Sequence, residues 1–348
     1  MQNFGSGNQQ GSRNSQGLKR QQGSRRQQGL GQQGFGQQAP SAQAIGEQLS
    51  EQLSSMQQAA SQYVINPLAK AAKGFINQVT TPASKRVELA RDPGRPNADY
   101  FINALFTQFM EMHGDRLDKD DNSIKGGIAY FHDLPVTVIA QCKGKNLEDN
   151  LKYNFGMPNP QGYRKAMRLA KQAEKFGRPI ITIIDTPGAY PGVEAEEKGQ
   201  GEAIARSIAL FSSLKVPVIA LFIGEGGSGG ALALGVANSI IMLENAIYSI
   251  LSPEGFAAIL WKDASRSKEA ASVMKLTSYD IASFGIADAV IPEGEPPLQM
   301  PCDDVVERID SVLVSEILRL APKDGEVLAQ ERYEKFRKIG KCIEMKGE

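Results

Sequence analysis

Residues 224–235 follow an uninterrupted apolar run at 216–223 and lead into further apolar positions, which predicts a buried strand, a sharp turn and a helix. Glycine occupies positions 226, 227, 229 and 230, so the backbone can turn tightly here and approach a ligand closely. The first amides of a helix have no internal partner and lie at the positive end of its dipole. A group that develops negative charge is the expected guest of this turn. Glycines that only permit close helix–strand packing are the alternative.

Three known motifs match parts of this turn and predict different chemistry. A GxGxxG dinucleotide fingerprint fits at 224–229, with Glu244 as the ribose ligand, so a nicotinamide-dependent dehydrogenase is the alternative function. A GxSxG nucleophile elbow fits at 226–230, but both histidines precede its serine, whereas that fold needs one after it. A P-loop needs a Lys-Ser or Lys-Thr pair after the glycines, and none follows them here.

From residue 124 onward, apolar runs alternate with helical periodicity, which is typical of an α/β domain with crossover connections. A hairpin is expected at 126–131 and 135–141, and buried strands at 179–184, 216–223 and 239–243. Helices are expected at 98–112, 162–176, 201–214, 231–236, 253–261, 303–320 and 325–339, the last two at the periphery.

The loop at 185–192 follows a buried strand and contains two Pro-Gly pairs, which make it rigid and tightly turned. Loops at the carboxyl ends of strands are where open α/β sheets bind ligands. The Asp-Thr-Pro-Gly run also occurs in GTPases, but no P-loop precedes it. Candidate substrate contacts are Asp185, Pro187, Gly188, Tyr190 and Gly192, and a turn without ligand contact is the alternative.

Several charged residues near these loops allow two interpretations. Arg164, at the start of the helix expected from 162, could bind a phosphate or carboxylate, but surface solvation explains it equally well. Lys143 and Lys145 carry the same ambiguity. The acidic residues at 194–197 and the serine at 252 are interpreted as helix capping.

Composition excludes several classes of protein. The chain has 39 basic and 39 acidic residues, so its net charge does not favour nucleic acid or an anionic membrane. No apolar run approaches the roughly 18–20 residues that span a membrane. The three cysteines form no CxxC pair, so we expect no metal site in this chain and a reducing, cytoplasmic location.

The amino-terminal region differs in composition from the rest. Gln and Gly make up about half of residues 1–40, which are basic and poor in apolar residues, so a disordered arm is expected. Weak electrostatic contact with nucleic acid is an alternative to an inert tail. A helix is expected at 42–63. The predicted division is therefore 1–40, a helical region at 41–112, a catalytic core at 113–295 and carboxyl-terminal helices at 296–348.

Taken in order, these motifs resemble the carboxyltransferase alpha subunits of bacterial acetyl-CoA carboxylases. The resemblance covers some 200 residues, from the VELARDPGRP run at 87–96 to the IPE run at 291–293. Its most specific parts are NFGMP at 154–158, IDTPGAYPG at 184–192, IGEGGSGGALA at 223–233 and SPEG at 252–255.

The resemblance implies a crotonase-like fold of repeated ββα units and the transfer of carboxylate from carboxybiotin, on a biotin carboxyl carrier protein, to acetyl-CoA, giving malonyl-CoA. It implies that Gly229 and Gly230 donate amides to the biotin-side oxyanion, that Gly226 and Gly227 shape the turn, and that the loop at 185–192 forms the adjacent wall. It also implies an α2β2 assembly with a zinc-containing beta subunit, which supplies most of the acetyl-CoA site, and biotin carboxylase in the full complex. No cofactor is expected to bind this chain itself.

Overall fold

The computed structural model describes residues 81–295 and 297–340. The expected arm at 1–40 and the expected helix at 42–63 lie outside these residues. The boundaries proposed at 112/113 and 295/296 remain predictions.

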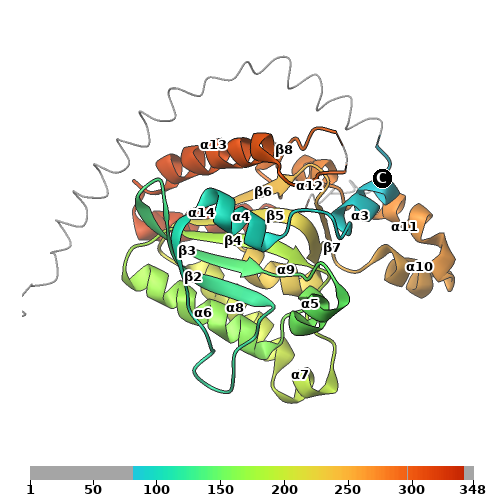
Figure 1. Ribbon diagram of the computed structural model, residues 1–348, viewed down its shortest axis with the longest axis horizontal. Coiled ribbons are helices and arrows are strands. Elements are labelled where there is room, and N and C mark those ends of the chain that lie inside the picture. Colours follow the sequence, from blue (N-terminus) through green and yellow to red (C-terminus); the bar gives the residue numbers. More distant parts are fainter. Residues whose placement is uncertain (1–80, 296, 341–348) are drawn as a thin grey trace, which may run out of the picture.

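The centre of the protein is a mixed sheet of eight strands in the described part of the chain (Figure 1). Its order is β1-β2-β3-β4-β5-β6-β8, and β7 pairs with the end of β5. The first three strands are antiparallel and the pairs from β3 onward are parallel. The bounds are β1 Thr107–Glu111, β2 Ile124–Phe131, β3 Leu134–Gln141, β4 Ile180–Thr186, β5 Val218–Gly227, β6 Ser239–Leu243, β7 Ile247–Ser249 and β8 Ala289–Ile291.

Helices connect and cover these strands. The α-helices are α3 Ala83–Ala90, α4 Ala98–Leu105, α5 Leu147–Lys152, α6 Pro160–Lys175, α7 Val193–Glu197, α8 Gln200–Ser213, α9 Ser228–Gly235, α10 Pro253–Trp261, α11 Ser267–Met274, α12 Ser278–Ser283, α13 Asp303–Leu320 and α14 Gly325–Arg337. Two short 3-10 helices are η1 Asn154–Gly156 and η2 Ala264–Arg266.

The hairpin and the buried strands expected from the sequence are confirmed, with ends shifted by a few residues. The helix expected at 98–112 is wrong in its second half: α4 ends at Leu105, and residues 107–111 form β1. The apolar spacing fitted one helix face, but pairing with β2 satisfies the backbone of this segment at the sheet edge. β1 thus belongs to the same sheet as the predicted core.

Helices lie on both faces of the sheet. On one face, α6 packs on β2 and β3, α9 packs on β4 and β5, and α8 lies outside them (Figure 1). On the other face, α4 contacts β1, β3 and β4, and α13 contacts α4 and β8. β4 and β5 are buried along their whole length, as expected for strands covered on both faces. α10 and α11 lie beside the sheet rather than over it.

The buried side chain of Arg332 is one of the contacts that fasten α14, the last described helix, to the body. The guanidinium of Arg332, which is 1% exposed, donates to the carbonyls of Phe211, Leu214 and Val216 and to Asn238 Oδ1. No carboxylate among the described residues pairs with it, and burial lowers its pKa to about 10. Arg332 therefore satisfies the carbonyls between α8 and β5 in place of water.

Replacing Arg332 with methionine should lower the free energy of unfolding by about 2–4 kcal/mol, because several buried acceptors lose their donor. Urea unfolding followed by circular dichroism measures this. Tyr333→Ser, at the exposed neighbouring position, is the matched control and should change little. Equal stability of the two variants would contradict the role assigned to Arg332.

The β2–β3 turn is joined to α13 by an ion pair between His132 Nε2 and Asp310 Oδ1, 2.7 Å apart. The hydrogen bond to Asp310 raises the pKa of His132, although partial burial opposes this. A histidine whose pKa is raised by folding stabilises the protein below its unfolded pKa of about 6.5. That contribution disappears as the pH rises through the folded pKa.

Asp310→Asn should therefore lower the melting temperature most below about pH 6.5, and the difference should shrink as the pH rises through the folded pKa of His132. Thermal unfolding of the two proteins across this range measures the difference. A difference that stays constant with pH would show that the ion pair contributes nothing.

Candidate active site at the carboxyl edge of the sheet

The glycine turn joins β5 to α9 through one residue with unusual backbone geometry. β5 continues through Gly227, and α9 begins at Ser228, whose φ of 51° lies in the left-handed region. Ser228 is exposed, Gly229 is half-buried and Gly230 is buried. The first amides of α9, which have no partner within the helix, therefore begin at the protein surface.

Two of these glycines are required by close backbone packing. A Cβ atom on Gly227 would lie 2.1 Å from the carbonyl oxygen of Pro187, and one on Gly230 would lie 2.6 Å from the amide nitrogen of Ala189. Gly226 would meet Phe222 at 2.6 Å. Gly229 is different, because its Cβ would meet only Ile204 Cγ2, at an ordinary 3.4 Å. Packing thus accounts for Gly226, Gly227 and Gly230 but leaves Gly229 unexplained.

The loop after β4 is held by hydrogen bonds within itself and to residues 156 and 158. Thr186 Oγ1 donates to the carbonyl of Gly156, 2.6 Å away, and accepts from the amide of Gly188. Further along, the amide of Tyr190 donates to Pro158 at 3.1 Å. Gly192, whose missing side chain leaves room for the Tyr190 ring, precedes α7. The structure therefore brings Asp185, Pro187 and Gly188 to the turn, whereas Tyr190 and Gly192 lie further along the loop.

A network of charges, in which the two carboxylates are buried, lies at the carboxyl ends of β3, β4 and β5. Lys143 Nζ is 2.7 Å from Asp185 Oδ1 and 2.7 Å from Glu225 Oε2, and Arg91 Nε is 2.7 Å from Glu225 Oε1. Burial lowers the pKa of Lys143, but the two carboxylates outweigh it and the pKa is raised. Burial raises the pKa of Glu225, but Lys143 and Arg91 outweigh it and the pKa is lowered. Lys143 and Glu225 are thus both charged near neutral pH despite their burial.

These charges line a cavity of about 210 Å³. Gly156, with φ of 74°, lets the stem of Lys143 approach, because a Cβ there would lie 2.5 Å from Lys143 Cγ. The predicted contacts Asp185 and Pro187 line this cavity. The other lining residues are Ala90, Arg91, Asp92, Pro93, Arg95, Asn97, Lys143, Gly144, Lys145, Asn150, Phe155 and Glu225.

Arg91 reaches the site because α3 and the residues after it are anchored just beyond the carboxyl ends of β6 and β8. Arg86 donates to the carbonyl of Glu244 and to Asn245 Oδ1, both at 2.9 Å. Arg95 donates to the carbonyl of Ile223 at 2.6 Å and forms a buried ion pair with Glu293. The position of Arg91 therefore depends on contacts between residues 86–95 and residues 223–293, which are distant in the sequence.

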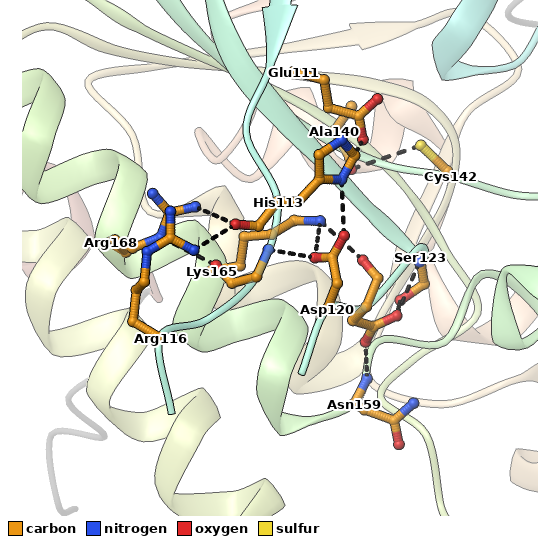
Figure 2. Close-up of polar contacts among 12 residues, drawn as sticks. Glu111, His113, Arg116, Asp120, Ser123, Ala140, Cys142, Asn159, Lys165 and Arg168 are labelled. Atoms are coloured by element: carbon orange, nitrogen blue, oxygen red, sulfur yellow. Dashed lines mark hydrogen bonds and ion pairs between the residues drawn. The ribbon is translucent and has the colours of Figure 1, made fainter. Parts of the chain in front are cut away.

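The loop before β2 supports the site from the other side through α6 (Figure 2). Lys165 Nζ lies 2.6 Å from Asp120 Oδ1, and His113 Nδ1 lies 2.9 Å from Asp120 Oδ2. Partial burial raises the pKa of Asp120, but Lys165, the Gly114 amide and His113 outweigh it and hold the pKa at about 2. Figure 2 shows Arg116 and Arg168 converging on the carbonyl of His113. The start of α6 is thereby fixed beside the loop that contains Gly156.

Arg164 lies in this supporting layer and not at the cavity. Its Nε is 2.8 Å from Asp115 Oδ2, and its Nη1 donates to the carbonyl of Lys198 at 3.2 Å. Its predicted role in substrate binding stays a prediction. The ambiguity of the two lysines is resolved in part: Lys143 is paired at the cavity, whereas Lys145 is exposed and its Nζ contacts Met300 Sδ at 3.4 Å.

The geometry does not suit the dinucleotide alternative. Gly224 and Gly226 lie within β5 rather than in a turn after it. Glu244, the proposed ribose ligand, is 1% exposed and accepts from the Tyr279 hydroxyl and the Glu293 amide. The strands follow each other in chain order, whereas the dinucleotide fold reverses that order at its binding crevice.

A second hollow, of about 360 Å³, lies on the other side of the turn. Ser228 and Gly229 lie on it together with mostly apolar side chains, namely Leu232, Ile240, Tyr248, Ile250, Ile281, Ile286, Phe336 and Ile339, and with Ser249. Neither histidine lines this hollow. His113 is bound to Asp120 and His132 to Asp310, both away from it. Ser228 thus has the strained backbone of a nucleophile elbow without the base that such a serine needs.

Among residues 81–295 and 297–340, no three His, Cys, Asp or Glu side chains are grouped so that they could hold a metal ion. None of the helices in the same residues combines the length and the apolar content that crossing a membrane requires.

Solved structures share the fold of this chain. Transcarboxylase 12S matches with a TM-score of 0.54 at 18% identity, over 68% of this chain and 45% of that one. The beta subunit of P. aeruginosa geranyl-CoA carboxylase matches with a TM-score of 0.50 at 15% identity, over 70% and 46%. This chain thus spans just under half of each longer chain. The fold is that of the crotonase-like carboxyltransferases, which confirms the expectation from the resemblance.

Sequence comparisons identify the family. A family profile described as acetyl co-enzyme A carboxylase carboxyltransferase-like matches residues 39–340. The carboxyl transferase subunit alpha of acetyl-coenzyme A carboxylase from Streptococcus equi subsp. equi is 57% identical over 258 residues, covering 74% of this chain and 99% of the relative. Its counterpart from Anoxybacillus flavithermus is 55% identical over 259 residues, covering 74% and 80%. The chain therefore belongs to the acetyl-CoA carboxylase carboxyltransferase family.

Replacing Lys143 with methionine should leave two adjacent carboxylates without their ammonium and lower the free energy of unfolding by about 3 kcal/mol at pH 8. Without the ammonium, burial and the neighbouring carboxylate favour the protonated form of Glu225, and its protonation relieves the repulsion at low pH. The deficit should therefore shrink as the pH falls toward about 5.

Urea unfolding at several pH values measures this deficit, with Lys145→Met at the exposed neighbouring lysine as the control. A deficit that grows on acidification would contradict the charge states assigned to the network.

Proposed function

We propose that this chain carries out the reaction of its family as the alpha subunit of an acetyl-CoA carboxylase carboxyltransferase, moving a carboxyl group from carboxybiotin to acetyl-CoA to give malonyl-CoA. The family profile over residues 39–340 and the relatives at 55–57% identity support this function. The product would enter fatty acid biosynthesis.

The observation that carries the site assignment is the exposed start of α9. Carboxyl transfer develops negative charge on the thioester enolate and on the ureido oxygen of biotin. Fixed amides aimed at such an oxygen stabilise it without reorganisation, and one donor is worth about 3–4 kcal/mol. Gly229 is half-buried beside an apolar hollow, and packing does not explain its missing side chain. We assign the amides of Gly229 and Gly230 to the biotin-side oxyanion, with Gly226 and Gly227 shaping the turn.

The two hollows beside the turn suit different parts of the substrates. The apolar hollow beside Ser228 and Gly229 suits the hydrocarbon part of biotin and of its arm. On the other side, Asp185, Pro187 and Gly188 form the wall, and the charges around Lys143 hold that wall in place. Tyr190 and Gly192 act by shaping the outer part of the same loop.

The proposed partners follow from the alpha-subunit assignment. A beta subunit would complete the site, bring its own zinc and bind most of acetyl-CoA in an α2β2 assembly. The biotin carboxyl carrier protein would deliver carboxybiotin, which biotin carboxylase makes in the full complex. This chain itself would bind no cofactor. The two described cysteines, Cys142 and Cys302, are buried free thiols, which supports the expected cytoplasmic location.

Gly229→Pro should reduce turnover about a hundredfold, because proline has no amide hydrogen to donate to the oxyanion. The assay is carboxyl transfer from malonyl-CoA to biocytin by the complex with the beta subunit. The chain alone should be nearly inactive.

Gly229→Ala is the matched variant, because it keeps the amide and its Cβ meets only Ile204 at 3.4 Å. It should be far more active than the proline variant. A folded Gly229→Pro complex with full turnover would refute the oxyanion assignment.

A further inference from the structure

Three buried polar side chains from three different elements donate hydrogen bonds to backbone carbonyls of α9. Gln141 Nε2, on β3, lies 2.8 Å from the carbonyl oxygen of Gly230. Ser207 Oγ, on α8, lies 2.6 Å from that of Ala233, and Thr182 Oγ1, on β4, lies 2.9 Å from that of Leu234. All three side chains belong to residues that are 0% exposed. Only Gln141 reaches the first turn of α9; the other two hold its last turn.

Gln141 is itself rigidly placed. It is the last residue of β3 and is paired with Ile124 of β2, so the sheet fixes its backbone. On the opposite side of Gly230, the backbone of Gly188 and Ala189 lies so close that a Cβ could not fit. The first turn of α9 is therefore held between one side-chain donor and one loop.

The choice of glutamine at this position carries a cost. Gln141 Oε1 is buried and has no hydrogen-bond partner among the described residues. An unsatisfied buried acceptor costs about 1–3 kcal/mol, and an apolar side chain of similar size would avoid this. Packing alone therefore does not explain a glutamine here. What a leucine or methionine could not supply is the N–H group that donates to the Gly230 carbonyl.

We propose that Gln141 is a positioning residue for carboxyl transfer: by holding the carbonyl of Gly230, it orients the amides at the start of α9 toward the developing oxyanion. The inference rests on the proposed function. The carbonyl of Gly230 and the amide of Ala231 share one peptide plane, so the bond fixes that plane directly. Through the helical turn it also fixes the amides of Gly229 and Gly230, which would touch the reacting group.

The orientation of these amides acts on charge that exists only in the transition state, so it influences kcat rather than KM.

Gln141→Leu should reduce kcat roughly tenfold to a hundredfold, because a small misplacement of catalytic groups is costly, while KM for malonyl-CoA changes little. The assay is malonyl-CoA to biocytin transfer by the complex with the beta subunit. Thr182→Val and Ser207→Ala are the matched controls, since each removes a buried bond to α9 at its far end. They should lower stability to a similar degree and leave kcat unchanged.

Gln141→Glu separates positioning from structure. The neutral acid can still donate to the Gly230 carbonyl, whereas the carboxylate cannot, and burial raises its pKa. Its kcat should therefore approach that of the wild type at low pH and fall as the pH rises, in a step that the wild type and the two controls lack. This variant also serves if Gln141→Leu does not fold.

Two outcomes would overturn the inference. One is wild-type kcat in Gln141→Leu; the other is a loss of kcat that follows the loss of stability equally in all three donor variants. A wild-type complex without any turnover would instead refute the proposed function, and this inference with it.

Discussion

The close contact between two backbone segments, 187–189 and 227–230, is the constraint on which the site depends. Side chains would keep these segments apart, because a Cβ on Gly227 or Gly230 would lie within 2.6 Å of the opposing backbone. The contact places the loop after β4 directly against the start of α9. It accounts for Gly227 and Gly230, whereas Gly226 makes room for Phe222, and Gly229 is half-buried beside Ile204.

The supporting layers around this contact differ in chemistry. On the cavity side, a balanced set of charges, Arg91, Lys143, Asp185 and Glu225, joins the ends of three strands. Behind α9, the contacts are neutral hydrogen bonds from Gln141, Thr182 and Ser207. Neutral donors hold the helix without adding a net charge beside the proposed oxyanion site, while the charges of the ion network are paired with one another.

The sequence predicted the alternation of buried strands and helices well, because short apolar runs flanked by glycine and proline are typical of buried strands. It also located the glycine turn and the loop at 185–192. It failed at residues 107–111, where pairing with β2 overrode a helical pattern. Arg91, Gln141 and Glu225 were missed, because their importance comes from contacts with residues 40 to 134 positions away. The one available signal was a charged residue, Glu225, inside an otherwise apolar and glycine-rich strand.

The anchoring of α3 has a consequence for synthesis of the protein. From β1 to β6 the strands lie in chain order, so each of them can add beside its predecessor as the chain emerges, and β7 and β8 then pair with β5 and β6. α3 does not follow this order, because the residues that anchor it are synthesised much later. Arg86 forms its hydrogen bond with Asn245, and Arg95, just after α3, forms its ion pair with Glu293. A nascent chain that ends before β8 can build most of the sheet but lacks Glu293, the ion-pair partner of Arg95 close to Arg91. The segment that carries Arg91 is therefore fully anchored only after β8 has been synthesised.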